Sequence, residues 1–243
     1  MGQDRDGMKS FDDILQVDDR NQIFVSVDRV TGERRRVTRE DRYNMISEYG
    51  LHEGVPDKVA TQYDVARDLY IYAWFEYRFY NVAEIQALMA LEFALNIRIG
   101  KEALKAYIKD RKRKHRDATG KGIRISDGMK TLIEYCRDHK LIRNEHFTAW
   151  YAQPQKQAEM DMLMASISKM EKEGLQELEV DYSQAEYSSP SIDYDHVEHL
   201  VEYVNKIRNN YAHGSSMLHP NVLGTFVMVS EFINAIYQEE RSV

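Results

Sequence analysis

The stretch from Tyr63 to Ile99 constrains the fold of this chain more than any other. It is rich in Tyr, Phe, Leu and Ala, and it contains neither proline nor glycine, the residues that most often interrupt helices. We therefore expect one long helix here, or two helices with a break near Tyr80–Asn81. Aromatic residues occur all around this helix, which favours a packed core over a platform on which bases stack.

Three later segments also carry apolar residues at helical spacing. They are Met129, Leu132, Ile133 and Cys136, in a helix capped by Ser126 or Asp127 that runs to about Leu141; Met160, Leu163, Met164, Ile167 and Met170, in a helix over Gln157–Gly174; and Val222, Phe226, Val229, Ile233 and Ile236, in a last helix opened by Pro220. We interpret the methionine-rich set as ordinary packing, although methionines also form adaptable contact surfaces. The acidic segment Glu177–Asp195 is expected to be a surface connection.

The N-terminal part of the chain has a different pattern. Gln22–Val27 and Arg34–Val37 are typical of two strands of a hairpin, and Thr38 then caps a helix that ends near Gly50. The segment Leu51–Lys58 is typical of a linker. Because an isolated hairpin is marginally stable in water, we expect this unit to pack on the rest of the protein or on a partner.

The composition is that expected of a soluble, cytoplasmic protein. A chain of 243 residues fits a large domain with an appendage, so we divide it into an extension over 1–60 and a helical domain over 61–243. Cys136 is the only cysteine, which fits a reducing compartment, and no apolar signal segment follows Met1. The apolar stretch Val82–Ile99 is interrupted by charged residues, so we expect no membrane span.

The charge of the chain is distributed unevenly. Its net charge is −7, but the segment from Lys101 to Arg124 has a local excess of +7, which leaves −14 for the rest. The possible RNA-binding residues in this segment are Lys109, Arg111, Lys112, Arg113, Lys114 and Arg116, which could hold phosphates without reading sequence. The simpler interpretation, which we favour, is a solvated loop between helices.

A further amphipathic helix ends in an unusual position for an arginine. Its apolar residues are Val197, Leu200, Val201, Val204, Ile207 and Tyr211. At about 100° per residue, Arg208 falls within this stripe, close to the line of Val201 and Val204. A cation on a packing face is costly unless it is paired or used, so we single out Arg208 as a candidate functional residue.

Glu92 is a candidate partner for Arg208. It lies among large apolar residues of the central helical stretch, so we expect it to be buried or half-buried and to seek a cation. In the interpretation that we favour, the two residues form a salt bridge that fixes the packing of two helices. In the alternative, Glu92 orients Arg208 toward a phosphate.

His213 is the second candidate at the end of this helix. Five steps of an ideal helix would turn it about 140° away from Arg208. Gly214 readily adopts the left-handed conformation that ends a helix, so His213 could swing toward Arg208 at the following bend. A histidine there suits general acid–base chemistry near neutral pH.

The run Arg208-Asn209-Asn210-Tyr211-Ala212-His213-Gly214 fits an Arg-x(4–6)-His motif and closely resembles the form that it takes in the HEPN superfamily. A looser similarity extends from about Asp68 to the C-terminus. The resemblance implies an all-α fold, a HEPN-like antiparallel helical bundle, here with a small N-terminal β-hairpin and helix as an extension. It also implies a homodimer in which two motifs meet in one cleft.

The resemblance further implies a function. Many HEPN domains are metal-independent endoribonucleases, hydrolases that act on RNA in toxin–antitoxin and related conflict systems. On this chain His213 would transfer protons, Arg208 would stabilise charge on the phosphate, and Asn209 would position the phosphate or the histidine, with Glu92 and Tyr211 in support. This chemistry requires no cofactor.

Two alternatives belong to other classes of protein. One is a non-catalytic HEPN-like dimerisation or binding module, for example beside a nucleotidyltransferase partner. The other is an antitoxin-type partner or scaffold in which Arg208 and His213 only stabilise a helix end. A metal site is not expected, because His196 and His199 lack a third ligand at suitable spacing, and no glycine-rich phosphate loop is present.

Overall fold

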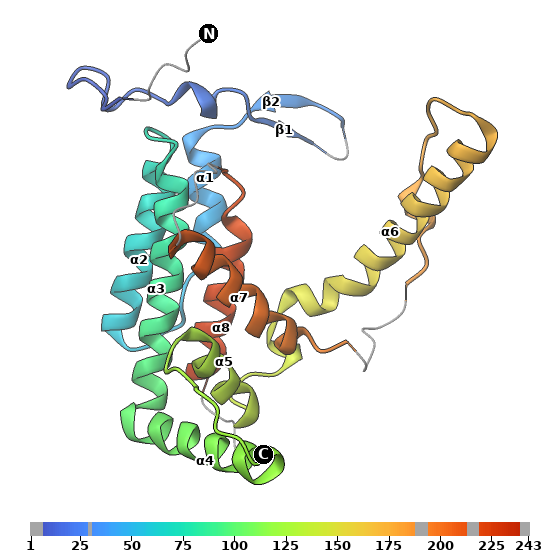
Figure 1. The fold of residues 1–243 in the computed structure, drawn as a ribbon. Coiled ribbons are helices and arrows are strands. Elements are labelled where there is room, and N and C mark those ends of the chain that lie inside the picture. Colours follow the sequence, from blue (N-terminus) through green and yellow to red (C-terminus); the bar gives the residue numbers. More distant parts are fainter. Residues whose placement is uncertain (1–6, 29–30, 188–193, 213–218, 239–243) are drawn as a thin grey trace.

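The fold is described here from a computed structural model of the chain, shown in Figure 1. It describes residues 7–28, 31–187, 194–212 and 219–238, apart from the side chains of Asn209, Asn210 and Ala212. The elements in chain order are η1 (Asp19–Asn21), β1 (Val25–Val27), β2 (Arg34–Arg36), α1 (Arg39–Ser47), α2 (Asp57–Tyr72), α3 (Phe79–Ile99), α4 (Lys101–Thr119), α5 (Met129–Asp138), η2 (Asn144–His146), α6 (Thr148–Glu173), η3 (Tyr182–Gln184), α7 (His196–Ala212) and α8 (Leu223–Tyr237). The described chain is mainly helical, as predicted.

The predicted N-terminal hairpin and helix are confirmed. β1 and β2 pair antiparallel, with Ser26 opposite Arg35. Thr38 caps α1 through a reciprocal capping box, in which its hydroxyl accepts from the Asp41 N–H while the Asp41 carboxylate accepts from the Thr38 N–H. The boundary placed at residue 60 falls inside α2, which begins at Asp57.

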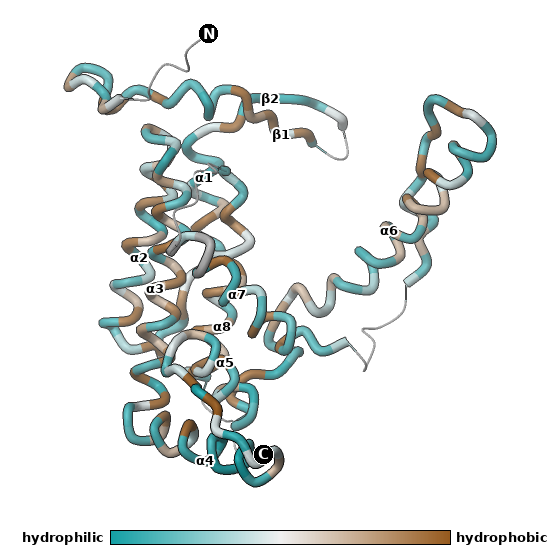
Figure 2. The backbone as a smooth tube through the Cα atoms, viewed as in Figure 1, coloured by the Kyte–Doolittle hydropathy of each residue, from teal (hydrophilic) through white to brown (hydrophobic). Residues whose placement is uncertain are grey.

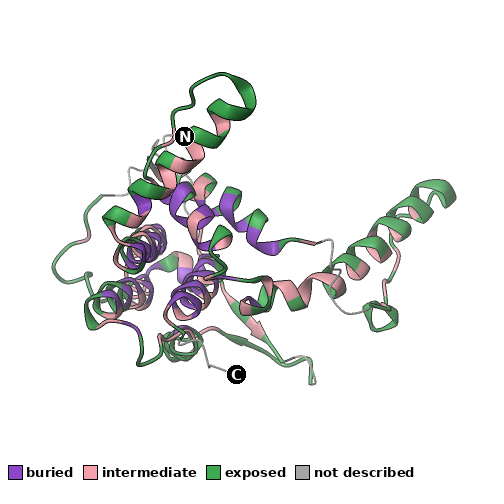
Figure 3. Cartoon of the chain, turned by 90° about the horizontal axis from the view of Figure 1, so that it is seen from below, coloured by how far each residue is buried: buried purple, intermediate pink, exposed green. Residues whose placement is uncertain are grey.

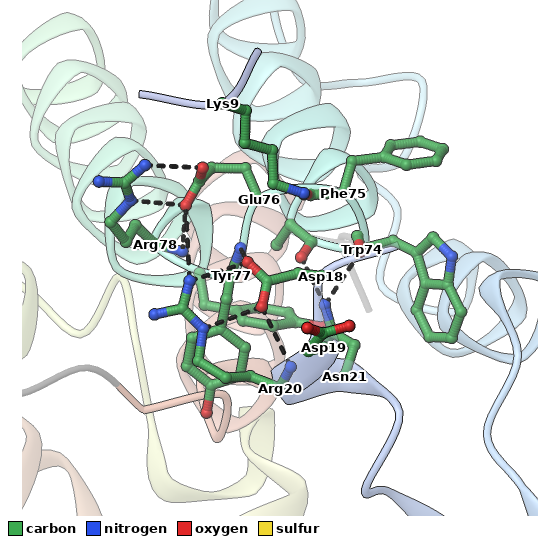
Figure 4. Close-up of polar contacts among 12 residues, drawn as sticks. Lys9, Asp18, Asp19, Arg20, Asn21, Trp74, Phe75, Glu76, Tyr77 and Arg78 are labelled. Carbon is green, nitrogen blue, oxygen red and sulfur yellow. Dashed lines mark hydrogen bonds and ion pairs between the residues drawn. The ribbon is translucent and has the colours of Figure 1, made fainter. Parts of the chain in front are cut away.

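The N-terminal segment packs on the turn between α2 and α3 (Figure 4). The Asn21 side chain donates to the carbonyl oxygens of Ala73 and Trp74 at 2.8 and 3.1 Å, and Lys9 donates to that of Phe75 at 2.6 Å. The Asp18 carboxylate accepts from the backbone N–H of Tyr77 at 3.0 Å. These contacts satisfy backbone groups that a helix end leaves unpaired.

The Tyr63–Ile99 stretch forms two helices, one of the two alternatives predicted. Their break lies at residues 73–78, a few residues before the predicted position at Tyr80–Asn81. The difference has a physical cause, since the N-terminal segment supplies the hydrogen bonds that a continuous helix would otherwise provide at this turn. Sequence periodicity within 63–99 cannot reveal a partner from residues 9–21.

The hydrophobic core lies between α2, α3 and α8, with α5 and α7 packed against α3 (Figures 1 and 2). α2 and α3 are antiparallel neighbours. The predicted stripe of α8 is confirmed, because all five of its residues are almost fully buried: Val222, Phe226, Val229, Ile233 and Ile236. The inner side predicted for α5 is likewise buried, although its N-cap is Gly128 and not Ser126 or Asp127.

α6 departs from the packing that we predicted. It begins at Thr148, nine residues before the predicted start at Gln157, and Pro154 lies inside the helix. Described along its whole length, α6 has no buried residue, and Figure 3 shows it projecting from the rest of the protein. Met160, Met164 and Ile167 are 52%, 58% and 40% exposed. The interpretation of this set as ordinary packing is wrong, since helical spacing shows that residues share a face but not what covers it.

α4 also differs from the sequence interpretation. The basic segment is helical from Lys101 to Thr119, so the solvated loop that we favoured there is wrong. Lysine, arginine and alanine are good helix formers, and buried Leu104 and half-buried Ile108 give the helix a packed side. The helix ends where Gly120 adopts a left-handed conformation with φ 70°.

Candidate functional site

The end of α7 carries the candidate residues. The first half of this helix packs firmly, with Val197, Leu200, Val201 and Val204 buried. Further along, Ile207 and Tyr211 are only half-buried, and the Arg208 side chain is 49% exposed. The prediction that Arg208 lies on the packing face is therefore wrong. The long side chain leaves the apolar stripe and carries its guanidinium to the protein surface.

Glu92 on α3 is the partner of Arg208, as predicted. Its side chain is 29% exposed, and one carboxylate oxygen lies 3.9 Å from Nη2 of Arg208. This is an ion pair at the edge of contact range between two groups that water reaches, so it contributes little to stability. It holds the guanidinium near α3 without using up its donors.

The other two motif residues, Asn209 and His213, lie partly or wholly outside the described residues. Asn209 lies in the last part of α7, but its side chain is outside what the structure describes. His213 falls between the described residues Ala212 and His219. The expected approach of His213 to Arg208 therefore stays a prediction.

A second carboxylate, Glu84, lies on α3 two turns before Glu92 and was not predicted. Only 4% of Glu84 is exposed, and its carboxylate accepts hydrogen bonds from the hydroxyls of Tyr211 and Thr225. Nε2 of His219 lies 3.7 Å from the same carboxylate. Glu84 is a buried carboxyl group whose partners come from three separate parts of the chain.

Tyr211, which we expected to support the site, thus fixes the last turn of α7 to α3. Burial and the hydrogen bond to Glu84 raise the pKa of its phenol, so the phenol stays protonated and acts as a donor. Tyr211 follows Arg208 by three residues, and the two side chains bind two carboxylates on α3, Glu84 and Glu92. The polar contacts of this helix end define where the guanidinium of Arg208 lies.

His219 adds an imidazole to this region. Its side chain is 37% exposed, Nε2 lies 3.5 Å from the Tyr211 hydroxyl, and its backbone N–H donates to the Asn81 side chain at 3.4 Å. Arg208 and His219 pair with carboxylates two turns apart on α3, about 12 Å along the helix, so the guanidinium and the imidazole lie at separate positions. The exposed guanidinium can bind an anion.

A signal for Glu84 was present in the sequence. It lies between Ala83 and Ala87 in the same helical stretch as Glu92, and the argument that a carboxylate among apolar residues needs a partner applies to it equally. His219 gives no such signal, because it lies outside any periodic segment. Its position near Glu84 depends on the path of the chain between α7 and α8.

The six possible RNA-binding residues of α4 divide between two faces. Lys109, Lys112, Arg113 and Arg116 line an open hollow together with other basic residues of α4. Arg111 and Lys114 lie on the opposite face, where Arg111 pairs with Glu134 on α5, and Lys114 pairs with Asp110 at 2.9 Å.

No metal site emerges from the described residues. Within 7–28, 31–187, 194–212 and 219–238, no three His, Cys, Asp or Glu side chains are placed to hold a metal ion. His196 is buried against Phe147, and burial lowers the pKa of its imidazole. Cys136 is buried, and burial raises the pKa of its thiol to about 12, so it is a poor nucleophile.

Comparison with protein-family models, curated proteins and solved structures finds no match for this chain. Among the described residues, no helix has the length and apolar character needed to cross a membrane.

Proposed function

We propose that this chain is a metal-independent endoribonuclease of the HEPN type, a component of a toxin or defence system. The observation that carries the proposal is the exposure of Arg208, in the motif at the end of α7, together with its contact with Glu92. Its guanidinium is half-exposed, is held near α3 by Glu92, and retains donors for a ligand. A half-exposed guanidinium with free donors is suited to a phosphate, which it can bind through two hydrogen bonds.

In the proposed reaction the 2′-hydroxyl of RNA attacks the neighbouring phosphorus atom, and the bond from phosphorus to the 5′-oxygen breaks. His213 accepts the proton of the 2′-hydroxyl or donates one to the leaving oxygen, and Arg208 stabilises the charge on the phosphorus-bound oxygens. Asn209 positions the phosphate or the histidine. The products are a 2′,3′-cyclic phosphate and a 5′-hydroxyl. A homodimer would bring two such motifs into one cleft.

The test is cleavage of total RNA by the purified protein in EDTA, with His213→Ala and Arg208→Ala beside the wild type. Lys206→Ala and His199→Ala are matched controls, because both residues are exposed on α7. We expect cleavage by the wild type and both controls, and its loss in both motif variants. A folded, dimeric wild type that leaves RNA intact, or motif variants as active as the controls, would refute the proposal.

The second candidate is a non-catalytic dimerisation or binding module, or an antitoxin-type partner. One observation favours it: α6 projects from the protein, and it exposes Met160, Met164 and Ile167 along one side. Flexible methionine side chains suit contact with a partner protein. Intact RNA in the assay above would favour this candidate over the nuclease.

A further inference from the structure

The hollow beside α4 has a volume of about 1130 Å³ and is strongly basic. Six of its lining residues are cations of α4: Lys101, Lys105, Lys109, Lys112, Arg113 and Arg116. Arg124, which follows the helix, lines it too. Of the described lining residues, only Asp110 and Asp127 are acidic. We call this hollow the α4 groove.

Helix geometry makes the α4 groove linear. At about 100° per residue, Lys105, Lys109, Lys112 and Arg116 all lie within about 80° of Lys101 around the helix axis. The row from Lys101 to Arg116 spans about 22 Å at about 1.5 Å per residue. A straight row of cations fits a linear polyanion better than it fits a small compact anion.

Most of these cations lack a compensating acid. Lys105 pairs with Glu102, and Arg113 pairs with Asp110. Lys101, Lys109, Lys112, Arg116 and Arg124 form no ion pair with any residue that the structure describes. Like charges on neighbouring turns of a helix repel one another, so an anion that binds along this row would stabilise it.

The groove also leads toward Arg208. Asn96 of α3 lines the groove, and its amide donates to the backbone oxygen of Glu92 at 2.8 Å. Glu92 in turn lies 3.9 Å from Arg208. Asn96 and Glu92 are one helical turn apart on α3, about 6 Å, and face the same side. The end of the groove at Asn96 therefore lies close to the candidate site at Arg208.

We propose that the α4 groove binds the sugar–phosphate backbone of single-stranded RNA and directs it to Arg208. This inference rests on the function proposed above and adds where the substrate lies. The rest of the chain carries a net charge of −14 by sequence, which repels RNA elsewhere and favours this one track. Contacts of lysine and arginine with phosphates are indifferent to sequence and sensitive to salt.

The test measures binding separately from cleavage. The probe is a fluorescein-labelled single-stranded RNA with 2′-O-methyl groups, which cannot be cut through its 2′-hydroxyls, and the readout is anisotropy over a range of salt concentrations. The groove variant is Lys112→Gln with Arg116→Gln. The matched control is Lys169→Gln with Lys172→Gln, which removes two charges from exposed positions on α6.

We expect the groove variant to bind about tenfold or more weakly than the wild type, and the slope of log affinity against log salt to fall by about 0.7 for each lost contact with the single-stranded RNA. The control should bind like the wild type. Equal losses in the control and the groove variant would overturn the proposal. So would a folded wild type that binds anionic lipid vesicles but not this RNA. Tight, groove-dependent binding without cleavage of ordinary RNA would support the groove and refute the nuclease.

Discussion

Arginine pairs with a carboxylate at two sites in this protein, and the sites differ in how many hydrogen bonds the arginine donates. Asp18, Arg20, Glu76 and Arg78 form a group that we call the N-terminal cluster (Figure 4). Arg20 donates to both oxygens of Asp18 at 2.9 and 2.8 Å, and Arg78 donates to both oxygens of Glu76 at 2.6 and 2.8 Å. At the end of α7, a single contact of 3.9 Å joins Arg208 to Glu92. In the first arrangement the arginines are fully engaged, and Asp18 also accepts from the Tyr77 N–H, which joins the N-terminal segment to the α2–α3 turn. The second arrangement leaves a cation available.

Burial of the carboxylates separates the two arrangements in the same way, although Arg20 and Arg78 are themselves 36% and 37% exposed. The side chains of Asp18 and Glu76 are 7% and 15% exposed, but that of Glu92 is 29% exposed. Breaking a buried, hydrogen-bonded pair leaves a desolvated charge and costs much stability, while breaking an exposed pair costs little. Stability should therefore depend on the N-terminal cluster, and activity on Arg208.

The largest expected effect is that of Arg208→Lys on RNA cleavage. Lysine keeps the charge but loses the planar fork that binds two phosphate oxygens, so we expect cleavage to fall by about 100-fold or more with little change in melting temperature. The paired variant Arg20→Lys should lower the melting temperature and leave cleavage per folded molecule unchanged. Equal cleavage by the Arg208→Lys variant and the wild type would contradict the role given to Arg208.

Asp18→Ala should cause the largest loss of stability. It removes the acceptor of Arg20 and of the Tyr77 backbone N–H, and we expect a decrease of about 3 kcal/mol in the free energy of unfolding. Urea unfolding followed by circular dichroism measures it. The neighbouring variant Asp19→Ala, at an exposed position, should change the value by less than about 0.5 kcal/mol. Similar decreases in the free energy of unfolding for the two variants would show that Asp18 does not stabilise the packing of the N-terminal segment.

The Asp18 carboxylate also makes the free energy of unfolding depend on pH in the acidic range. Burial alone would raise the pKa of Asp18, but hydrogen bonds from Arg20 and the Tyr77 N–H outweigh it and lower the pKa from 3.8 to about 2. A lowered pKa in the folded state means that the stabilisation is present above pH 3.8 and is lost as the pH falls toward about 2. The difference in urea midpoint between wild type and Asp18→Asn should therefore narrow over that range. A constant difference would mean that Asp18 titrates normally.

The buried carboxylate Glu84 gives a smaller effect. Tyr211→Phe removes one of its donors without changing the size of the ring, so we expect a decrease of about 1 kcal/mol in the free energy of unfolding. Tyr203→Phe on the same helix is the control, because its ring is 53% exposed. If both substitutions have the same effect on the urea midpoint, the Tyr211 hydroxyl does not fix the end of α7.

Features that depend on contacts between residues close in sequence were predicted, whereas features that depend on distant segments were not. The stripe of α8, the buried residues of α5 and the capped helix after the hairpin depend on local spacing, and all were predicted. The position of the α2–α3 break, the exposed face of α6 and the Glu84 cluster depend on segments far apart in the chain, and they were not. Periodicity places residues on a face, but only the fold supplies the neighbour.

Arg208 shows the same limit within the candidate site. Because α7 is helical through Arg208, the backbone of this residue has the predicted phase, and its partner Glu92 was also predicted. Its exposure was not, because the guanidinium lies several bonds from the backbone, and the packing of α7 loosens toward its end. The position of a residue around the helix axis predicts where its side chain leaves the backbone, but not where the charged end of a long side chain lies.

The smallest expected effect on stability, that of Glu92→Gln, decides what the Arg208–Glu92 pair does. We expect less than about 0.5 kcal/mol of change in the free energy of unfolding, because the pair is distant and half-exposed. The informative readout is kcat and KM for RNA cleavage. A carboxylate that orients Arg208 would, when neutralised, lower kcat about tenfold or more, whereas one that competes with phosphate would lower KM at constant kcat. A large loss of stability instead would mean that the pair is a packing salt bridge, comparable to the N-terminal cluster, and the contrast between the two arrangements would fail.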